Sequence, residues 1–262
     1  MSSTSSYGSD TSEPATAIVI DNGSYSVKCG FGGEDAPETC FVTYHDVTKT
    51  CEDDNTLLHE NYHFVDERDL PYSILNPGDF NKYPVISEGV VKDWDCLEAL
   101  WEKFLLENKV DCSEQPVVML SAISNNSAAS TRKFCEISFE KFGFKKLCIA
   151  APETMALVAS GKDMAVVTNI GYDNCVSVPT ICPLNGFKKK VTREAKTEDV
   201  KIFPVKVGGK HVSARFRTVA APERKYSPWI GASIFSSLSG FGDYGLSNLD
   251  FEEHGPDGME IL

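Results

Sequence analysis

Residues 17–31 read AIVIDNGSYSVKCGF, and the interpretation of the whole chain begins from this stretch. Its first four residues are apolar and predict a short buried strand. Residues 21–24 (DNGS) predict a tight hairpin turn, since Asn-Gly tolerates the positive φ of a primed turn. Polar and apolar residues then alternate over residues 26–31, which predicts a return strand with one face in water.

Two interpretations of this hairpin are open. Such a turn can surround an anion with backbone N–H groups and a hydroxyl, with Lys28 one strand pair away. It can equally be an ordinary surface hairpin, and the spacing alone favours that second interpretation.

Three ordered blocks carry a resemblance to a known family. The first is DNGS at 21–24, followed by Lys28 and by GFGGEDAPE at 30–38. The second is KYPVISEGVVKDWD at 82–95, and the third is APERKYSPWIGASIFSSLS at 221–239, followed by HGP at 254–256. In this order they resemble the actin and actin-related protein family, and three blocks are more specific than one short motif.

The composition excludes several classes of function. A formal net charge of −13 argues against direct binding to nucleic acid or to an acidic membrane, because both need a positive surface. Nine cysteines without paired spacing are typical of reduced thiols. No stretch has the length of a membrane span, and the leader lacks the apolar core of a signal peptide. We therefore expect a cytoplasmic, cytoskeletal location, with the nucleus as the alternative.

The resemblance implies an α/β, actin-like (ribonuclease-H-like) fold in which subdomains 1 and 2 are largely kept and the second repeat is incomplete. The implied parts begin with a disordered leader at 1–16 and the first repeat (subdomain 1) at 17–162, which contains a subdomain-2-like insert at 41–87. A remnant of the second repeat follows at 163–221; it corresponds to subdomain 3, and subdomain 4 is missing. A C-terminal helix and tail at 222–262 pack back on subdomain 1.

Periodicity predicts alternating strands and helices after Lys92. The predicted helices are 94–105, capped by Asp93; 131–142, stopped by Gly143; and 153–160, stopped by Gly161. The predicted strands are 116–120, 147–150, 164–169, 175–181 and 187–191. The resemblance implies a further strand at 215–220 and a terminal helix that starts at 227–229 with Ser227 as its cap. Strand–helix alternation implies a parallel core with helices on its faces.

A second short motif is HENYH at residues 59–63, which formally matches the helix of zinc proteases. In that helix two histidines one turn apart hold the metal and the glutamate acts as base. The segment here lacks an amphipathic stripe and no third ligand follows it. We therefore expect no metal site.

The resemblance also implies a nucleotide site. The matching positions are Asp21, Gly23, Ser24 and Lys28 in a first phosphate loop, Gly171 in a second loop and Lys225 near the adenine. Tyr25 departs from the family pattern, which commonly has glycine there. These matching residues are either a degenerate site or retained hairpin architecture.

The second loop departs further. The family pattern is Asp-Ser-Gly-Asp-Gly with a histidine a few residues later, whereas residues 169–173 read NIGYD and Val176 stands in place of the histidine. Pro152 replaces a glutamine that helps position the attacking water. Phosphoryl transfer depends on positioning and electrostatics. We therefore expect no ATPase activity, and ATP or ADP with magnesium bound weakly or not at all.

The resemblance further implies an apolar cleft that takes an amphipathic helix from partner proteins. Its residues here are Val158, Gly161, Ile230, Ile234, Phe235 and Leu238. The same spacing is typical of an ordinary core, so both interpretations are open.

We expect a non-catalytic, actin-like binding protein of the cytoskeleton or of another actin-related complex, with actin or actin-binding proteins as partners. The alternatives are an ATP-binding, filament-forming actin-related protein, a nuclear actin-related subunit of a chromatin complex, and a gene fragment whose product does not fold.

Overall fold

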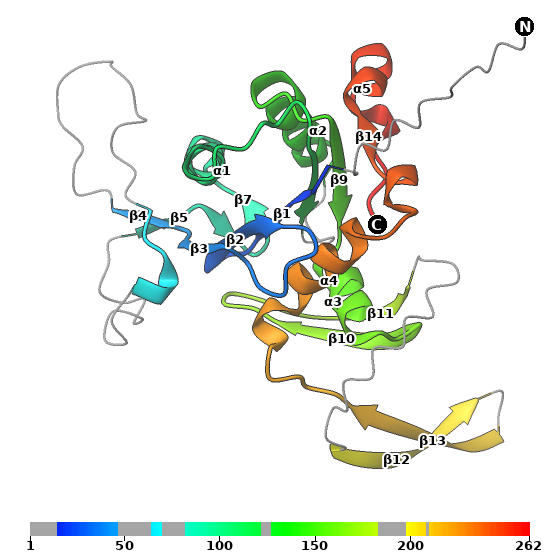
Figure 1. Cartoon of the computed structure of the whole chain (residues 1–262). Coiled ribbons are helices and arrows are strands. Elements are labelled where there is room, and N and C mark those ends of the chain that lie inside the picture. The colour runs from blue at the N-terminus through cyan, green and yellow to red at the C-terminus, as the bar shows by residue number, and fades with distance from the viewer. Residues whose placement is uncertain (1–14, 47–63, 70–81, 122–126, 183–197, 208–209) are drawn as a thin grey trace, which may run out of the picture.

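A computed structural model describes residues 15–46, 64–69, 82–121, 127–182, 198–207 and 210–262 (Figure 1). Most of the predicted leader, the zinc-like motif at 59–63 and the strand predicted at 187–191 lie outside these residues, as does much of the insert predicted at 41–87.

A six-stranded mixed sheet forms the centre of the molecule, in the order β14-β9-β8-β1-β2-β3. Its strands are β1 (Ile18–Asn22), β2 (Ser26–Phe31), β3 (Thr39–Val42), β8 (Pro116–Leu120), β9 (Lys146–Ala150) and β14 (Leu246–Ser247). Neighbours β1, β8 and β9 pair in parallel, and the other pairs are antiparallel. The first apolar run is therefore an inner strand with a partner on each side.

Helices cover both faces of this sheet (Figure 1). They are α1 (Trp94–Glu107), α2 (Ala128–Glu136) with a π-helical continuation at Ile137–Lys141, α3 (Pro152–Ser160), α4 (Ser227–Ser236) and α5 (Asn248–His254). Ile18 and Ile20 of β1 join the core under α1 and α2, while Val19 joins the core under α3 and α4. Successive side chains of a strand point to opposite faces, so an apolar run fits a sheet that is covered on both sides.

Four further strand pairs lie outside this sheet. They are β4 (Tyr44–Asp46) with β5 (Lys82–Pro84), β6 (Ile86–Ser87) with β7 (Val90–Val91), β10 (Met164–Ile170) with β11 (Cys175–Ile181), and β12 (Glu198–Val207) with β13 (Lys210–Thr218). Short 3-10 helices occur at Glu67–Asp69, Arg224–Tyr226, Phe241–Asp243 and Gly255–Gly258. The C-terminal segment returns to β9, where the Ala151 N–H donates to the Leu262 carbonyl at 2.7 Å.

The predicted bounds of α1, β9, α3 and β10 are within two residues of the structure, and three other predictions differ more clearly. The helix predicted from 131 begins at Ala128, because the Ser127 side chain accepts a hydrogen bond from the Ser130 N–H and caps it earlier. Ser227 does not cap α4: it lies inside the helix, and the cap position is Tyr226 without a side-chain hydrogen bond. The last predicted strand, at 215–220, is part of β13, which ends at Thr218.

The contact between α3 and α4 depends on a glycine. A Cβ added at Gly231 would lie 1.7 Å from the Met155 carbonyl oxygen of α3. The two backbones are therefore too close for any side chain at this position, and α4 is fixed against the sheet through this approach.

We expect Gly231→Ala to lower the free energy of unfolding by about 3 kcal/mol, because the helices must separate or distort. In an uncrowded helix the same change stabilises by about 1 kcal/mol, so the sign of the change in unfolding free energy tells a crowded position from an open one. Urea denaturation measures this change. Gly242→Ala is the control, since nothing lies within 4 Å of its added Cβ. Equal midpoints for the two variants would contradict the close crossing.

Candidate functional site

Asn22, at the end of β1, anchors the first hairpin. Its Nδ2 donates to the Leu120 carbonyl at 3.2 Å, and its Oδ1 accepts from the Trp101 indole N–H at 3.0 Å. Asn22 stays in the strand, and neither it nor Gly23 has positive φ. The predicted primed turn is therefore wrong, because these long-range hydrogen bonds hold the asparagine extended. Gly23 is still required, since its Cβ would lie 2.8 Å from the Ser26 carbonyl oxygen.

The predicted wet face of β2 is also wrong. Ser26, Lys28 and Gly30 are all buried. Trp229 of α4 covers this face, and a Cβ added at Gly30 would lie 2.7 Å from its Cζ2 atom. The Trp229 indole N–H donates to the Val19 carbonyl at 3.2 Å. The alternation of polar residues in β2 therefore marks a buried polar face.

Lys28 and Asp21 form an ion pair within the hairpin. They are opposite each other in the β1–β2 register, and the Lys28 Nζ lies 3.1 Å from the Asp21 Oδ2. Lys28 Nζ also donates to the Ser26 carbonyl at 3.4 Å. Both residues are buried, with 8% and 7% of their surface exposed. The charge of Lys28 is thus neutralised by its own hairpin. Nearby, the Ser24 carbonyl accepts from the Thr43 hydroxyl at 2.7 Å.

The second predicted loop is the turn between β10 and β11. The Asn169 Nδ2 donates to the Glu153 Oε1 at 3.2 Å. Glu153 lies in the first turn of α3 and is 5% exposed. The Gly171 N–H donates to the Asn174 carbonyl at 2.9 Å, so this glycine serves the turn itself. The sequence did not predict the contact of Glu153 with Asn169. The one sign of such a contact was a carboxylate within an otherwise apolar predicted helix.

Tyr25 and Tyr172 bring the two hairpins together. Their ring centroids are 5.6 Å apart and the rings are inclined by 40°. Both tyrosines stand at positions where the sequence departs from the family pattern, but their mutual contact was not predicted. Burial, followed by the negative charge of Glu67, raises the pKa of Tyr25, so its phenol stays neutral.

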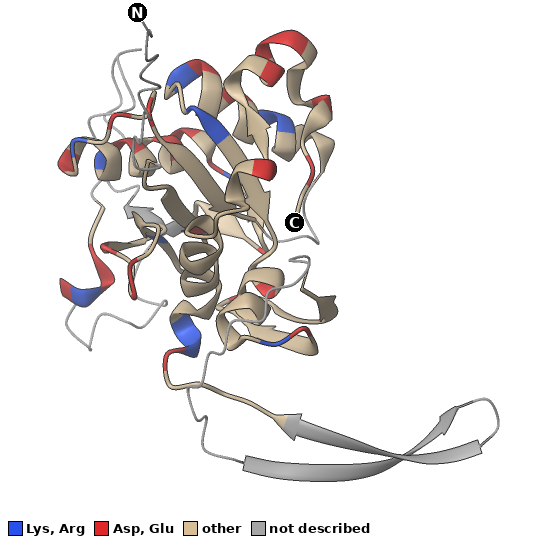
Figure 2. Ribbon diagram, turned by 45° about the vertical axis from the view of Figure 1, so that its right-hand side comes forward, with Lys and Arg blue, Asp and Glu red and all other residues tan. Residues whose placement is uncertain are grey.

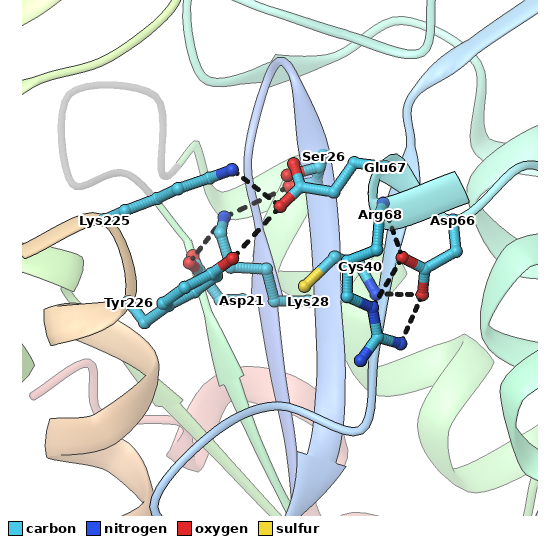
Figure 3. Close-up of polar contacts among 9 residues, drawn as sticks. All are labelled: Asp21, Ser26, Lys28, Cys40, Asp66, Glu67, Arg68, Lys225 and Tyr226. Carbon is cyan, nitrogen blue, oxygen red and sulfur yellow. Dashed lines mark hydrogen bonds and ion pairs between the residues drawn. The ribbon is translucent and has the colours of Figure 1, made fainter. Parts of the chain in front are cut away.

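Lys225 is paired with Glu67 (Figure 3). The Lys225 Nζ lies 2.6 Å from the Glu67 Oε1, which also accepts from the Tyr226 hydroxyl at 3.3 Å. Burial alone would lower the pKa of Lys225, but the hydrogen bond and charge of Glu67 outweigh it, and the pKa is raised. The Glu67 side chain is 5% exposed, and its Oε2 has no hydrogen-bond partner among the residues described.

The turn that carries Glu67 is fixed by its neighbours (Figure 3). Asp66 accepts from the Cys40 N–H at 3.1 Å and pairs with Arg68 at 2.6 Å. Burial would raise the pKa of Asp66, but these hydrogen bonds lower it. Glu67 was missed because its segment has no periodicity, and only the fold places it beside Lys225.

The predicted cleft residues lie together on α3 and α4. Val158 and Phe235 are fully buried in the core cluster beneath these helices. Ile230, Ile234 and Leu238 pack against that cluster and are half-buried. Gly161 ends α3 in the left-handed conformation, with φ of 63°. The six residues thus comprise two core members, the glycine that ends α3, and a half-buried apolar stripe (Ile230, Ile234 and Leu238) along α4 and just beyond its end.

The comparisons with known proteins agree with this architecture. The Actin family model matches residues 12–182 and 182–261. The chain belongs to the actin family. It is 26% identical to Actin-like protein 7B of Homo sapiens over 168 residues, and 27% identical to Actin-like protein 7B of Rattus norvegicus over the same length. Each alignment covers 62% of this chain and 38% of the relative, so this actin-family chain spans less than half of either relative.

Two features are absent from the described part of this actin-family chain. None of its helices has the length and apolar character to cross a membrane. No group of three or more His, Cys, Asp and Glu side chains there is arranged to hold a metal ion.

We expect Lys28→Met to lower the free energy of unfolding by about 3 kcal/mol, because it leaves the buried Asp21 carboxylate without its cation. The double variant Asp21→Asn, Lys28→Met should recover part of this loss, since no unpaired charge remains. Urea denaturation measures both. Lys145→Met is the control, because its pair with Glu114 is 3.8 Å long and exposed. A Lys28 variant as stable as the control would show that the pair is not structural.

Proposed function

We propose that this actin-family chain acts by binding other proteins and does not hydrolyse ATP. The observation that carries the proposal is the contact between Tyr25 and Tyr172. The resemblance assigns both positions to phosphate loops, where backbone amides must come close to an anion. Two bulky rings in contact at this place favour a site closed to phosphates.

The residues present do not fit ATP with magnesium. Lys28 is neutralised by Asp21, and Lys225 is paired with Glu67. Asn169 and Tyr172 stand in place of two carboxylates that help to hold hydrated metal in the family pattern. The buried Glu67 Oε2, an acceptor without a donor among the described residues, disfavours an anion near Lys225. Phosphoryl transfer needs positioned cations and water, and these residues supply neither.

The stripe on α4 supports a binding role. Ile230 and Ile234 of α4 and Leu238, two residues beyond its end, follow one another at intervals of four residues, and each is half-buried. A partner helix with apolar residues at the same spacing could lie along such a stripe. We propose actin or actin-binding proteins as partners, at the cytoskeleton in the cytoplasm.

A second surface supports the same role. The outer face of the β10–β11 hairpin carries four exposed apolar side chains, Met164 at 73%, Val166 at 65%, Ile170 at 79% and Ile181 at 74%, with the hydrogen-bonded pair of Thr168 and Ser177 among them. Figure 2 shows that the two strands carry no charged residue. Exposed apolar side chains gathered on one face are typical of protein contacts.

We expect the purified chain to show no stoichiometric binding of ATP with magnesium in isothermal titration calorimetry at micromolar protein. We also expect no release of γ-phosphate, because the chain lacks the groups that position metal and water. Actin measured alongside serves as the positive control. Magnesium-dependent binding at one ATP per chain would overturn the proposal.

We expect Ile234→Asp to weaken co-sedimentation with actin filaments, or binding of a synthetic amphipathic helix, by about tenfold, because a charge would enter the apolar contact. Leu249→Asp on α5 is the matched control, since Leu249 is 73% exposed on another element. Circular dichroism verifies that both variants fold. Equal binding by the two variants would remove the α4 stripe from the proposal.

A further inference from the structure

We infer that the tip of the β10–β11 hairpin is a clasp, which holds the first hairpin and the β6–β7 turn together without a bound nucleotide. This inference rests on the proposed function and describes how the same site is kept shut. It follows from two adjacent residues, Tyr172 and Asp173, that contact two different parts of the first half of the chain.

The clasp has one apolar and one polar contact. The Tyr172 ring meets the Tyr25 ring of the first hairpin at a centroid distance of 5.6 Å. The Asp173 Oδ2 accepts the backbone N–H of Glu88, in the β6–β7 turn, at 2.5 Å. A hydrogen bond from a backbone N–H to a carboxylate is charge-assisted, and such bonds are among the stronger polar contacts. The tip is therefore held from two directions at once.

The β6–β7 turn has a conformation that suits this contact. Glu88 and Gly89 both have positive φ, at 52° and 78°, which is the pattern of a type I′ hairpin turn. Asn or Gly normally occupies the first of these positions, and a glutamate there is energetically unfavourable. Such outliers persist where surrounding contacts hold them, and the bond to Asp173 is one such contact.

The β10–β11 hairpin needs such support. Its inner face packs on α3, whereas its outer face, with Met164, Val166 and Ile170, is exposed. A two-stranded hairpin needs packing against other elements to be stable in water, and α3 supplies such packing on one face only. Among the described strands, β10 and β11 pair only with each other. The contacts at the tip should therefore contribute measurably to the order of the whole hairpin.

Amide hydrogen exchange on the full chain without nucleotide tests the clasp. We expect Asp173→Ala to speed exchange of the Glu88 amide about tenfold, since a charge-assisted hydrogen bond is lost. We expect Tyr172→Ala to speed exchange of the Gly171 amide about fivefold, since an aromatic pair is lost. Tyr172→Phe, which keeps the ring, should stay within about twofold of the unmodified chain, and Asp173→Asn, which keeps an acceptor oxygen but loses the charge, should give a rate between those of the unmodified chain and Asp173→Ala.

Two results would overturn the clasp: alanine variants that exchange within twofold of the unmodified chain, or a phenylalanine variant that exchanges as fast as Tyr172→Ala. Tyr172 is 44% exposed, so its replacement should leave the core folded, and unchanged exchange of the β8 amides verifies this. The calorimetric ATP titration decides the proposed function separately. Binding of ATP would contradict the proposed function. The clasp is tested separately, by amide hydrogen exchange measured without ATP.

Discussion

The burial of a lysine and an aspartate in the first hairpin constrains everything around them. A charge removed from water must be paired, or the fold becomes much less stable. Lys28 and Asp21 satisfy each other across β1 and β2, with Trp229 of α4 covering the same face. On that face the Trp229 side chain lies against Gly30 of β2, and Gly231 leaves room for the α3 backbone beside α4. The ion pair within the hairpin and the packing of α4 against β2 therefore keep the same face of the hairpin buried.

The same constraint extends to the other polar residues that the resemblance connects with a nucleotide. Asn169 donates to the buried Glu153, and Lys225 pairs with the buried Glu67. In both cases a carboxylate supplied by the protein satisfies the polar group. The substitutions in the second loop and the carboxylates on α3 and at 67–69 therefore form one consistent set. Lys28, Asn169 and Lys225 each have a carboxylate partner within the chain, which reduces any need for a bound ligand.

Much of the fold follows from local patterns in the sequence. The strands at 116–120 and 175–181 have the predicted bounds, and Gly143 and Gly161 adopt the left-handed conformation expected after a helix. These features depend on residues close in the chain. The wet face predicted for β2 failed because its cover, Trp229, comes from a distant segment. The Asn-Gly turn failed for a related reason: Trp101 and Leu120 fix Asn22 in a strand.

The candidate site was harder to predict because a motif records a residue type and not its contacts. Asn22 and Lys28 match the family pattern, yet each makes contacts that the hairpin itself needs. Such residues would be retained whether or not a nucleotide binds, so they discriminate poorly between a site and a scaffold. Tyr25 and Tyr172 discriminate better, because both depart from the family pattern in its phosphate loops. Their contact is a property of two substitutions taken together, and only the folded chain brings them within reach of each other.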